Sequence, residues 1–187
     1  TYFDRTANNL TNQSNRHPYS GESLFARYKD ENNYYYAGIR ADGYVVIKKK
    51  VNGTYTTLAT KKVLEGSYNN TSNPDLIPLN TWIGLKFTVT DDSDGVPQLV
   101  LETDVNWTGA WTQVLKIADT KGTALSNAGS VGIESDYADV RFDNFKLTNN
   151  ETTNIIDTLT DGVSPTDTSG QTQSTQANTY DKTVLAD

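Results

Sequence analysis

Apolar and polar residues alternate in short segments along most of this chain. In the segment TWIGLKFTVTD, the odd-numbered residues from Ile83 to Val89 are apolar, and the even-numbered residues from Trp82 to Thr88 form the opposite side. A period of two is typical of a β-strand with one buried side. No segment shows a convincing helical period, and turn residues recur at short intervals. The pattern therefore predicts an all-β protein, with an antiparallel jelly-roll sandwich as its architecture.

Residues 34–58 contain three β-rich runs joined by two tight turns. The turns are centred on Asp42-Gly43 and Asn52-Gly53, dipeptides that adopt the positive φ needed in a two-residue hairpin. This segment predicts a β-meander. Further along, GSVGIESDYADVRFDNFKLT is expected to complete the sandwich and to supply these core residues: Val131, Ile133, Val140, Phe142 and Phe145.

Composition divides the chain into three parts. Residues 1–20 predict one short strand and a polar loop, and residues 21–148 predict the sandwich itself. Residues 149–187 are rich in Thr, Ser and Asn and too poor in apolar residues to form a core, so they predict an extended linker or donor arm. Two patches in this arm, Ile155-Ile156 with Leu159 and Thr183–Leu185, are each long enough to add one strand to a sheet.

Charge and cysteine content narrow the possible functions. The 187 residues include 16 Lys and Arg against 23 Asp and Glu, a formal net charge of −7, which disfavours nucleic acid as a partner. The absence of cysteine excludes a disulfide framework, a thiolate metal site and a catalytic cysteine. No apolar run reaches about 18 residues, so no membrane span is expected, and no signal peptide is visible. A mature or excised segment fits this sequence.

Several asparagines stand in the Asn-x-Ser/Thr acceptor pattern for N-linked glycans. Such acceptors are used in secreted proteins, so they favour an extracellular or cell-surface location. The acceptors are Asn9, Asn12, Asn52, Asn69, Asn70, Asn106 and Asn150.

Three blocks of this sequence resemble the laminin-G-like or concanavalin A-like jelly rolls of secreted glycan-handling proteins. They are DENNYYYAGIRADGYVVIKKKVNGTYTTLA, LNTWIGLKFTVT and LSNAGSVGIESDYADVRFDNFKL. The resemblance implies a concanavalin A-like sandwich found in carbohydrate-binding modules, accessory domains of polysaccharide-degrading enzymes, and adhesive repeats. It also implies a structural Ca²⁺ near the last strand, with Asp143 and then Asp139 as ligands and Asp136 nearby. No other cofactor is expected.

The resemblance also indicates that a strand is missing. In such domains the last strand, here FDNF, commonly pairs near an opening strand that belongs to a longer N-terminal region. An unpaired row of backbone groups would then need a partner. The arm at residues 150–187, from the same chain or from a neighbouring subunit, is the predicted donor.

Two groups of residues are candidates for glycan binding. Aromatic rings stack on sugars, and cations bind their carboxylate or sulfate groups. If all residues of the first group lie on one face of a sheet, they form a surface that can bind an acidic sugar. Otherwise the aliphatic parts of the lysine side chains simply cover the tyrosine rings on a solvated face. The second group either binds sugar at a loop tip or caps the open end of the core. The first group is Tyr36, Arg40, Tyr44, Lys48 and Lys50; the second is Trp107 and Trp111.

Catalytic and metal-binding patterns are weak. The DDSDG segment lacks the acid that a calcium loop would need at Thr90, so it predicts a polar hairpin turn. His17 is the only histidine, too little for a triad or a histidine metal site. A polysaccharide lyase would use Tyr36 as both base and acid, with Arg40 and Lys48 neutralising the carboxylate of a uronate. No carboxylate pair suggests a glycosidase.

The sequence thus predicts an extracellular, non-catalytic glycan-binding module, with acidic polysaccharide as its ligand. The alternative is a structural or adhesive subunit of a filament or surface layer, a homo-oligomer assembled through residues 150–187. The second alternative is a polysaccharide lyase. Fold class alone does not choose among the three.

Overall fold

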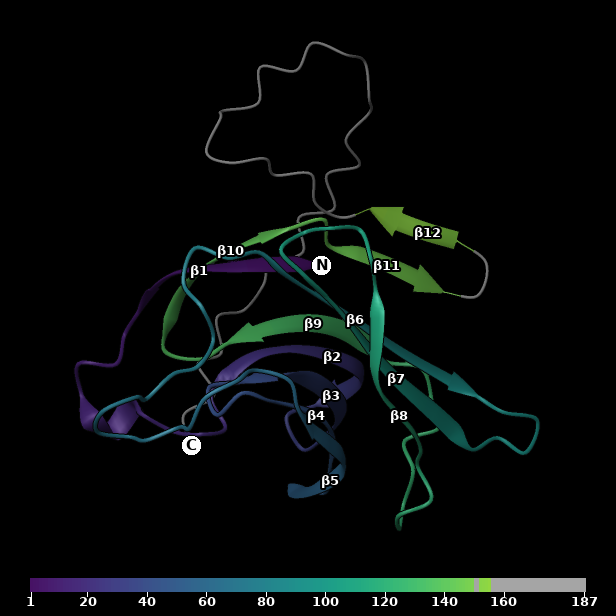
Figure 1. Cartoon of the computed structure of the whole chain (residues 1–187). Helices are drawn as coiled ribbons and strands as arrows, with labels where there is room; N and C mark the ends of the chain where they lie inside the picture. The colour runs from purple at the N-terminus through teal and green to yellow at the C-terminus, as the bar shows by residue number, and fades with distance from the viewer. Residues whose placement is uncertain (150–151, 156–187) are drawn as a thin grey trace.

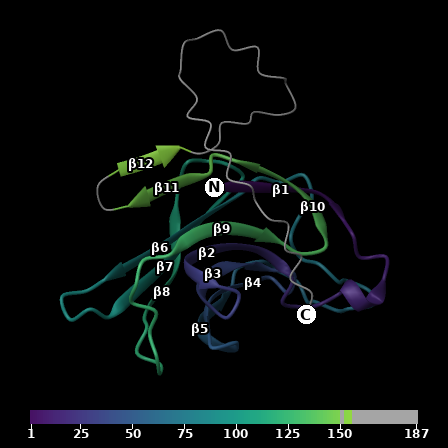
Figure 2. The ribbon, with the colours of Figure 1, turned by 180° about the vertical axis from the view of Figure 1, so that it is seen from behind.

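The computed structural model describes residues 1–149 and 152–155 and contains two five-stranded antiparallel sheets packed face to face (Figures 1 and 2). The β1 sheet has the order β10 (Ala138–Asp143), β1 (Tyr2–Asn8), β6 (Ile83–Asp91), β7 (Pro97–Val105) and β8 (Thr112–Ala118). The β3 sheet has the order β5 (Thr54–Lys62), β4 (Tyr44–Val51), β3 (Asn33–Arg40), β2 (Gly21–Asp30) and β9 (Ser130–Ser135). A separate hairpin follows, formed by β11 (Lys146–Asn149) and β12 (Thr152–Ile155).

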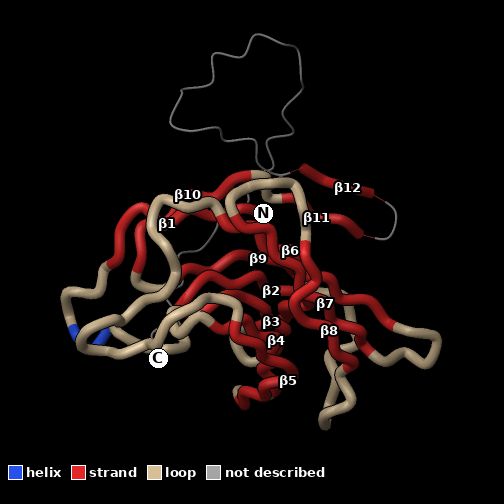
Figure 3. Tube along the Cα trace, in the orientation of Figure 1, coloured by secondary structure: helices blue, strands red, loops and turns tan. Residues whose placement is uncertain are grey.

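Strands and loops make up nearly all of the described chain, and the helical part is one short turn, η1 (Gln13–Asn15) (Figure 3). The predicted all-β antiparallel sandwich of the jelly-roll type is therefore confirmed. The finer assignment to the laminin-G-like or concanavalin A-like group stays a prediction. Among the described residues, no helix has the length and apolar character needed to cross a membrane.

The core lies between the two sheets and follows the alternation in the sequence. Ile83 and Leu85 are fully buried, and Phe87 and Val89 pack against them from the same side of β6. Val140 and Phe142 also contact the core, as expected.

The core prediction is wrong for Ile133, which is 37% exposed. Its strand, β9, is an edge strand that pairs only with β2 among the described strands, so no further strand covers this side chain. Val131 and Phe145 are only half-buried, because they line a cavity at the same edge of the sandwich.

The first strand belongs to the sandwich, contrary to the expectation that the last strand lacks its partner. β1 pairs with β10 from Tyr2 opposite Asp143 to Asn8 opposite Ala138. β1 pairs with β6, however, only at Ile83 and Gly84. The backbone of Leu85 bonds to Thr1, so the unpaired edge is the part of β6 beyond Leu85, which among the described strands has a partner on its β7 side alone.

The meander over β3, β4 and β5 forms as predicted. Gly43 has a φ of +81°, and Asn52 and Gly53 have φ values of +49° and +79°, so these turns use the left-handed conformations that the dipeptides favour. The resulting register places Lys48 opposite Tyr36 and Lys50 opposite Tyr34.

The beginning of the predicted arm forms β12, which pairs with β11 rather than with either large sheet. The predictions for residues 156–187, including Ile156, Leu159 and Thr183–Leu185, lie outside the described residues. The acceptor Asn150 does so too.

Candidate functional site: two aromatic surfaces and an edge cavity

The outer side of the β3 sheet carries a cluster of aromatic and lysine side chains. Along β4, Lys49 points into the core, so Lys48 and Lys50 point outward beside Tyr36 and Tyr34 of β3. We call this cluster the tyrosine–lysine face, and its members are Phe25, Tyr28, Tyr34, Tyr36, Lys48, Lys50 and Tyr55.

The rings of the tyrosine–lysine face contact one another, and the lysines lie over them. Tyr36 is 5.9 Å from Tyr34 and 6.1 Å from Tyr55 between ring centres. The Lys48 ammonium lies 5.6 Å from the Tyr36 ring centre, and that of Lys50 lies 4.7 Å from the Tyr55 ring centre. Tyr34 is only 3% exposed, whereas Tyr55 is 53% exposed. Lysine stems therefore cover part of the surface, as the simpler interpretation predicts, and Tyr55 remains open.

Ion pairing distinguishes the lysines of this face from Arg40. Among the described residues, neither Lys48 nor Lys50 forms an ion pair, whereas Arg40 pairs with Asp42. Burial and the nearby charge of Arg40 lower the pKa of Lys48. A partly desolvated cation without a counterion favours an anionic ligand.

The five predicted residues of this surface are not equally close to one another. Tyr36, Lys48 and Lys50 adjoin directly, and Arg40 is near enough to influence the Tyr36 and Lys48 pKa values. Tyr44 lies at the far end of β4, where the Lys62 ammonium is 5.5 Å from its ring centre. Sequence reasoning missed four rings of the cluster, although the Asn52-Gly53 hairpin register could have placed Tyr55 opposite Lys50. The missed rings are Phe25, Tyr28, Tyr34 and Tyr55.

A second aromatic cluster lies on the outer side of the β1 sheet. The Tyr2 ring crosses β6 at Gly84, where an added Cβ would come within 2.8 Å of it, and its hydroxyl donates to Asp104 of β7 at 2.6 Å. The Trp107 ring stacks on Tyr2 with 4.5 Å between ring centres and 6° between planes. The Tyr2 ring contacts Trp111 at 5.4 Å between centres. We call this cluster the tryptophan platform, and its members are Tyr2, Trp82, Trp107 and Trp111.

The loop that presents Trp107 is held in an unusual conformation. Asn106 and Trp107 have φ values of 65° and 51°, and positive φ in a residue as bulky as tryptophan is strained. Asp104 accepts hydrogen bonds from Thr108 and from the Gly109 backbone, which anchor this loop. Although desolvation opposes them, these bonds and that from Tyr2 lower the pKa of Asp104 to about 2. The short spacing between Trp107 and Trp111 predicted that these two rings belong to a site, but nothing in the sequence indicated that Tyr2 lies beside them.

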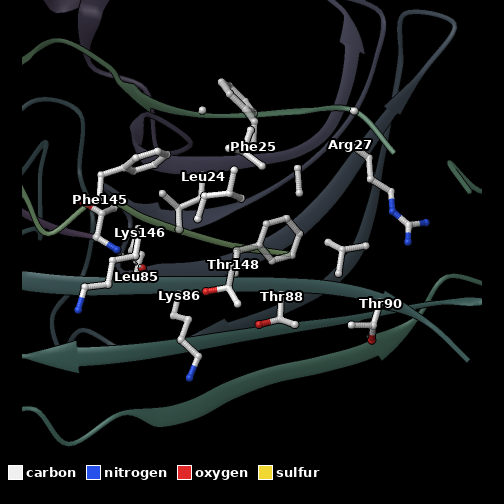
Figure 4. A pocket seen from close by; sticks show the side chains of 18 of the residues that line it. Leu24, Phe25, Arg27, Leu85, Lys86, Thr88, Thr90, Phe145, Lys146 and Thr148 are labelled. Atoms are coloured by element: carbon white, nitrogen blue, oxygen red, sulfur yellow. Dashed lines mark hydrogen bonds between the residues drawn. The ribbon is translucent and has the colours of Figure 1, made fainter. Parts of the chain in front are cut away.

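A cavity of about 960 Å³ opens at the edge where β6 lacks a partner (Figure 4). β2 and β9 line it from one sheet and β6 from the other, and β11 residues with Trp107 and Trp111 complete its walls. At one end, Arg27 donates two hydrogen bonds, of 2.9 and 2.8 Å, to the Asp91 carboxylate, which joins β2 to β6. The lining mixes apolar residues such as Leu24 and Phe145 with Thr88 and Lys146.

The expected calcium site receives no support from the geometry. Asp139 accepts a hydrogen bond from Asn9, and Asp143 accepts one from the Asn144 backbone. Within residues 1–149 and 152–155, no three acidic or histidine side chains are grouped so that they could hold a metal ion. The DDSDG segment forms the predicted hairpin turn, in which Asp92 caps backbone N–H groups. His17 stacks on Tyr19 in a loop.

Glycan acceptor positions lie on the surface. Every acceptor asparagine within the described part of the chain is exposed, and these are Asn9, Asn12, Asn52, Asn69, Asn70 and Asn106.

Two buried ion clusters were not anticipated from the sequence. Lys49 is 2% exposed and pairs with Asp119 across the core at 2.8 Å. Arg5 of β1 pairs with Glu22 of β2 at 2.5 Å and also with Asp75. Both clusters connect elements that are distant in sequence, so no local spacing reveals them.

Comparisons with known proteins place the chain near one solved structure. No protein-family model and no curated protein matches it. The chain is similar to a carbohydrate-binding module, CBM66 from Bacillus subtilis, with 17% sequence identity and a TM-score of 0.46. The similarity covers 74% of this chain and 66% of that one. A similarity this distant carries no inference about the ligand.

Proposed function

We propose that this protein is an extracellular, non-catalytic module that binds acidic polysaccharide at its tyrosine–lysine face. The observation that carries the proposal is the pair Lys48 and Lys50, which have no ion-pair partner among the described residues although the chain carries a net charge of −7. Beside them, the open Tyr55 ring offers a stacking surface. A sugar ring that carries a carboxylate or sulfate matches both features. The exposed acceptor asparagines agree with an extracellular location.

The lyase alternative is less well supported by the same surface. Burial and the neighbouring Tyr55 raise the pKa of Tyr36. A general base works best with a pKa near the operating pH, so a raised tyrosine pKa disfavours proton abstraction by Tyr36. The surface therefore favours binding over elimination chemistry.

Replacing both lysines with glutamine should weaken binding to acidic polysaccharide at least tenfold, because the variant keeps the hydrogen-bonding ends but loses both charges. Affinity electrophoresis in gels containing alginate, polygalacturonate or chondroitin sulfate measures the binding. The polysaccharide should retard the wild type, and it should retard Lys48→Gln/Lys50→Gln much less. The wild-type affinity should also fall as salt is raised, since exposed charge pairs are screened.

A matched control is Lys61→Gln/Lys62→Gln, which removes two exposed charges from the neighbouring strand β5. Equal retardation of wild type and the Lys48/Lys50 variant would refute the proposed site. An equal loss of retardation in the control variant would show that binding depends on overall charge rather than on this site.

The second candidate function, a subunit assembled by strand donation, is favoured by the unpaired part of β6. Leu85 exchanges both backbone hydrogen bonds with Thr1, so the alternate residues Phe87 and Val89 direct their N–H and C=O groups toward the same edge. Apart from the contacts of Thr1, Tyr2 and Phe3 with Leu85, Gly84 and Ile83, none of the described strands pairs with this edge. Such an edge can accept an added strand. The sequence predicts two donor segments, the patch at Ile155-Ile156 and Thr183–Leu185; since Ile155 already pairs within β12, Thr183–Leu185 is the one tested below.

If a donated strand pairs with β6, the amides of Phe87 and Val89 should exchange slowly with solvent in the full chain. Hydrogen exchange followed by NMR should then show faster exchange at both amides in Leu185→Asp and no change in Val163→Asp. Light scattering over a range of concentrations separates donation within one chain from donation between copies. Rapid exchange at both amides in the unsubstituted chain would rule out this function.

A further inference from the structure

We propose that the tryptophan platform is a second glycan site, specific for uncharged sugar rings, and that the protein bridges two different glycan chains. This inference rests on the proposed acidic-glycan site and extends it to the outer side of the other sheet. Four features carry it: a flat exposed ring, a fixed loop, two paired cations, and the placement of the two surfaces.

The platform presents one flat indole to solvent. The Tyr2 ring lies across the β6 backbone, because Gly84 has no side chain to displace it and Asp104 holds its hydroxyl on the next strand. Trp107 stacks on Tyr2 within 6° of parallel and is 37% exposed. The outer face of this indole therefore lies along the sheet surface. An apolar ring face of this kind binds the C–H face of a pyranose by stacking and burial of apolar area.

The loop is fixed before any ligand binds. The left-handed conformations of Asn106 and Trp107 are costly, and the bonds from Thr108 and Gly109 to Asp104 maintain them. Trp82 packs edge-on against Trp107 at 4.9 Å between ring centres and limits its rotation. A ring already held in its binding position loses little conformational freedom when it binds a ligand.

The two cations that lie over rings of the platform are paired, unlike the lysines of the tyrosine–lysine face. Lys86 lies 5.6 Å from the Trp111 ring centre, but its ammonium pairs with Glu102 at 2.6 Å. Arg141 lies over the Trp82 ring and pairs with Asp4. Both of these cations are neutralised by carboxylates, so neither is available to a carboxylate or sulfate on a sugar stacked on Trp107. The chemistry of the platform selects an uncharged sugar.

The two surfaces lie on the outer sides of different sheets and approach each other only at the edge cavity, which is lined by Phe25 of one and by Tyr2, Trp107 and Trp111 of the other. Tyr2 and Gly84 alternate along their strands with the core residues Phe3 and Ile83, so the platform lies on the outer side of the β1 sheet. The tyrosine–lysine face lies on the outer side of the β3 sheet, across the core from the platform. Since stacked sheets alone are about 10 Å apart, one sugar ring cannot contact Trp107 together with Lys48 and Lys50. Two occupied sites therefore connect two glycan chains.

A two-step biosensor experiment tests this inference on protein produced in a host that does not attach N-linked glycans. Alginate is immobilised, the protein is loaded on it, and soluble starch, galactomannan and hydroxyethyl cellulose are then passed over in turn. We expect at least one neutral polysaccharide to add a second increase in mass. Trp107→Ala should load normally and reduce the second increase at least tenfold. Trp107→Tyr, which keeps a stacking ring, should recover part of it.

The outcomes separate this inference from the proposed function. The control is Val105→Ala, which shortens an exposed side chain at the end of β7, two residues before Trp107. This variant should behave as wild type. Normal loading on alginate with no second increase for any neutral polysaccharide would overturn the platform site and leave the acidic site intact. With a neutral polysaccharide immobilised, Lys48→Gln/Lys50→Gln should still bind. If the protein has no acidic-glycan site, the wild type would bind the immobilised neutral polysaccharide but would not load on alginate.

Discussion

Lys49→Ala is expected to destabilise the protein by about 3–5 kcal/mol, because it leaves a buried carboxylate without its cation. The Lys49 ammonium donates to both oxygens of Asp119 at 2.8 Å and to the Thr123 carbonyl at 2.8 Å, and it also contacts the Lys121 carbonyl. Asp119 further accepts a hydrogen bond from Tyr35 at 2.5 Å. A loss of this size is a large share of the roughly 5–15 kcal/mol typical of a folded domain. Urea unfolding followed by tryptophan fluorescence measures it.

The neighbouring residue supplies the matched control. Lys48 points outward, so Lys48→Ala should change the free energy of unfolding by no more than about 1 kcal/mol while it weakens glycan binding. The double variant Lys49→Met/Asp119→Leu should recover much of the stability that Lys49→Ala loses, since it removes both charges. Equal unfolding free energies for Lys48→Ala and Lys49→Ala would show that the buried pair does not form in solution.

The three consecutive lysines, Lys48 to Lys50, show how much of the site can be predicted from the sequence alone. Strand alternation predicts that Lys48 and Lys50 share one side, and the register confirms their position beside Tyr36 and Tyr34. The same alternation sends Lys49 to the other side, yet it does not reveal that this side is the core. Lys49 can be buried because of Asp119, which follows 70 residues later. Contacts of such long range depend on the packing of the sheets, which local patterns do not encode.

The tryptophan platform was predictable only in part. The spacing of Trp107 and Trp111 in a Gly-containing loop drew attention to both rings. The flat support beneath Trp107 depends on Tyr2 lying opposite Gly84, a pairing between strands about 80 residues apart. Sequence patterns offered no reason to connect these two residues.

The unpaired edge was expected, but at the wrong strand. The resemblance implied a missing partner for the last strand, and β1 occupies that place. Because β1 pairs with β6 only at Ile83 and Gly84, the free backbone groups lie on β6 instead. No residue pattern in β1 or β6 indicated that β1 pairs with β10 or which residues of β6 it contacts.

A second buried cluster links the two sheets at Arg5. Its guanidinium donates to Glu22 at 2.5 Å and contacts Asp75, so two buried carboxylates share one cation. Burial raises the pKa of Glu22 to about 7; Arg5 opposes this shift, and the charge of Asp75 adds to it. Burial also raises the pKa of Asp75. The cluster therefore binds a proton more tightly in the folded protein than in the unfolded chain.

Stability should consequently fall as the pH rises from about 4.5 to about 7. Below the unfolded pKa of Glu22 both states are protonated and its contribution is fully present, and it is lost as the pH passes through the folded pKa. Glu22→Gln mimics the protonated form, so its unfolding free energy should vary less over this range, by on the order of 3 kcal/mol. Asp104, with a pKa lowered to about 2, titrates at lower pH and does not interfere. Urea titrations of both proteins at half-unit pH steps measure the difference, and parallel curves would mean that Glu22 is ionised in the folded protein throughout.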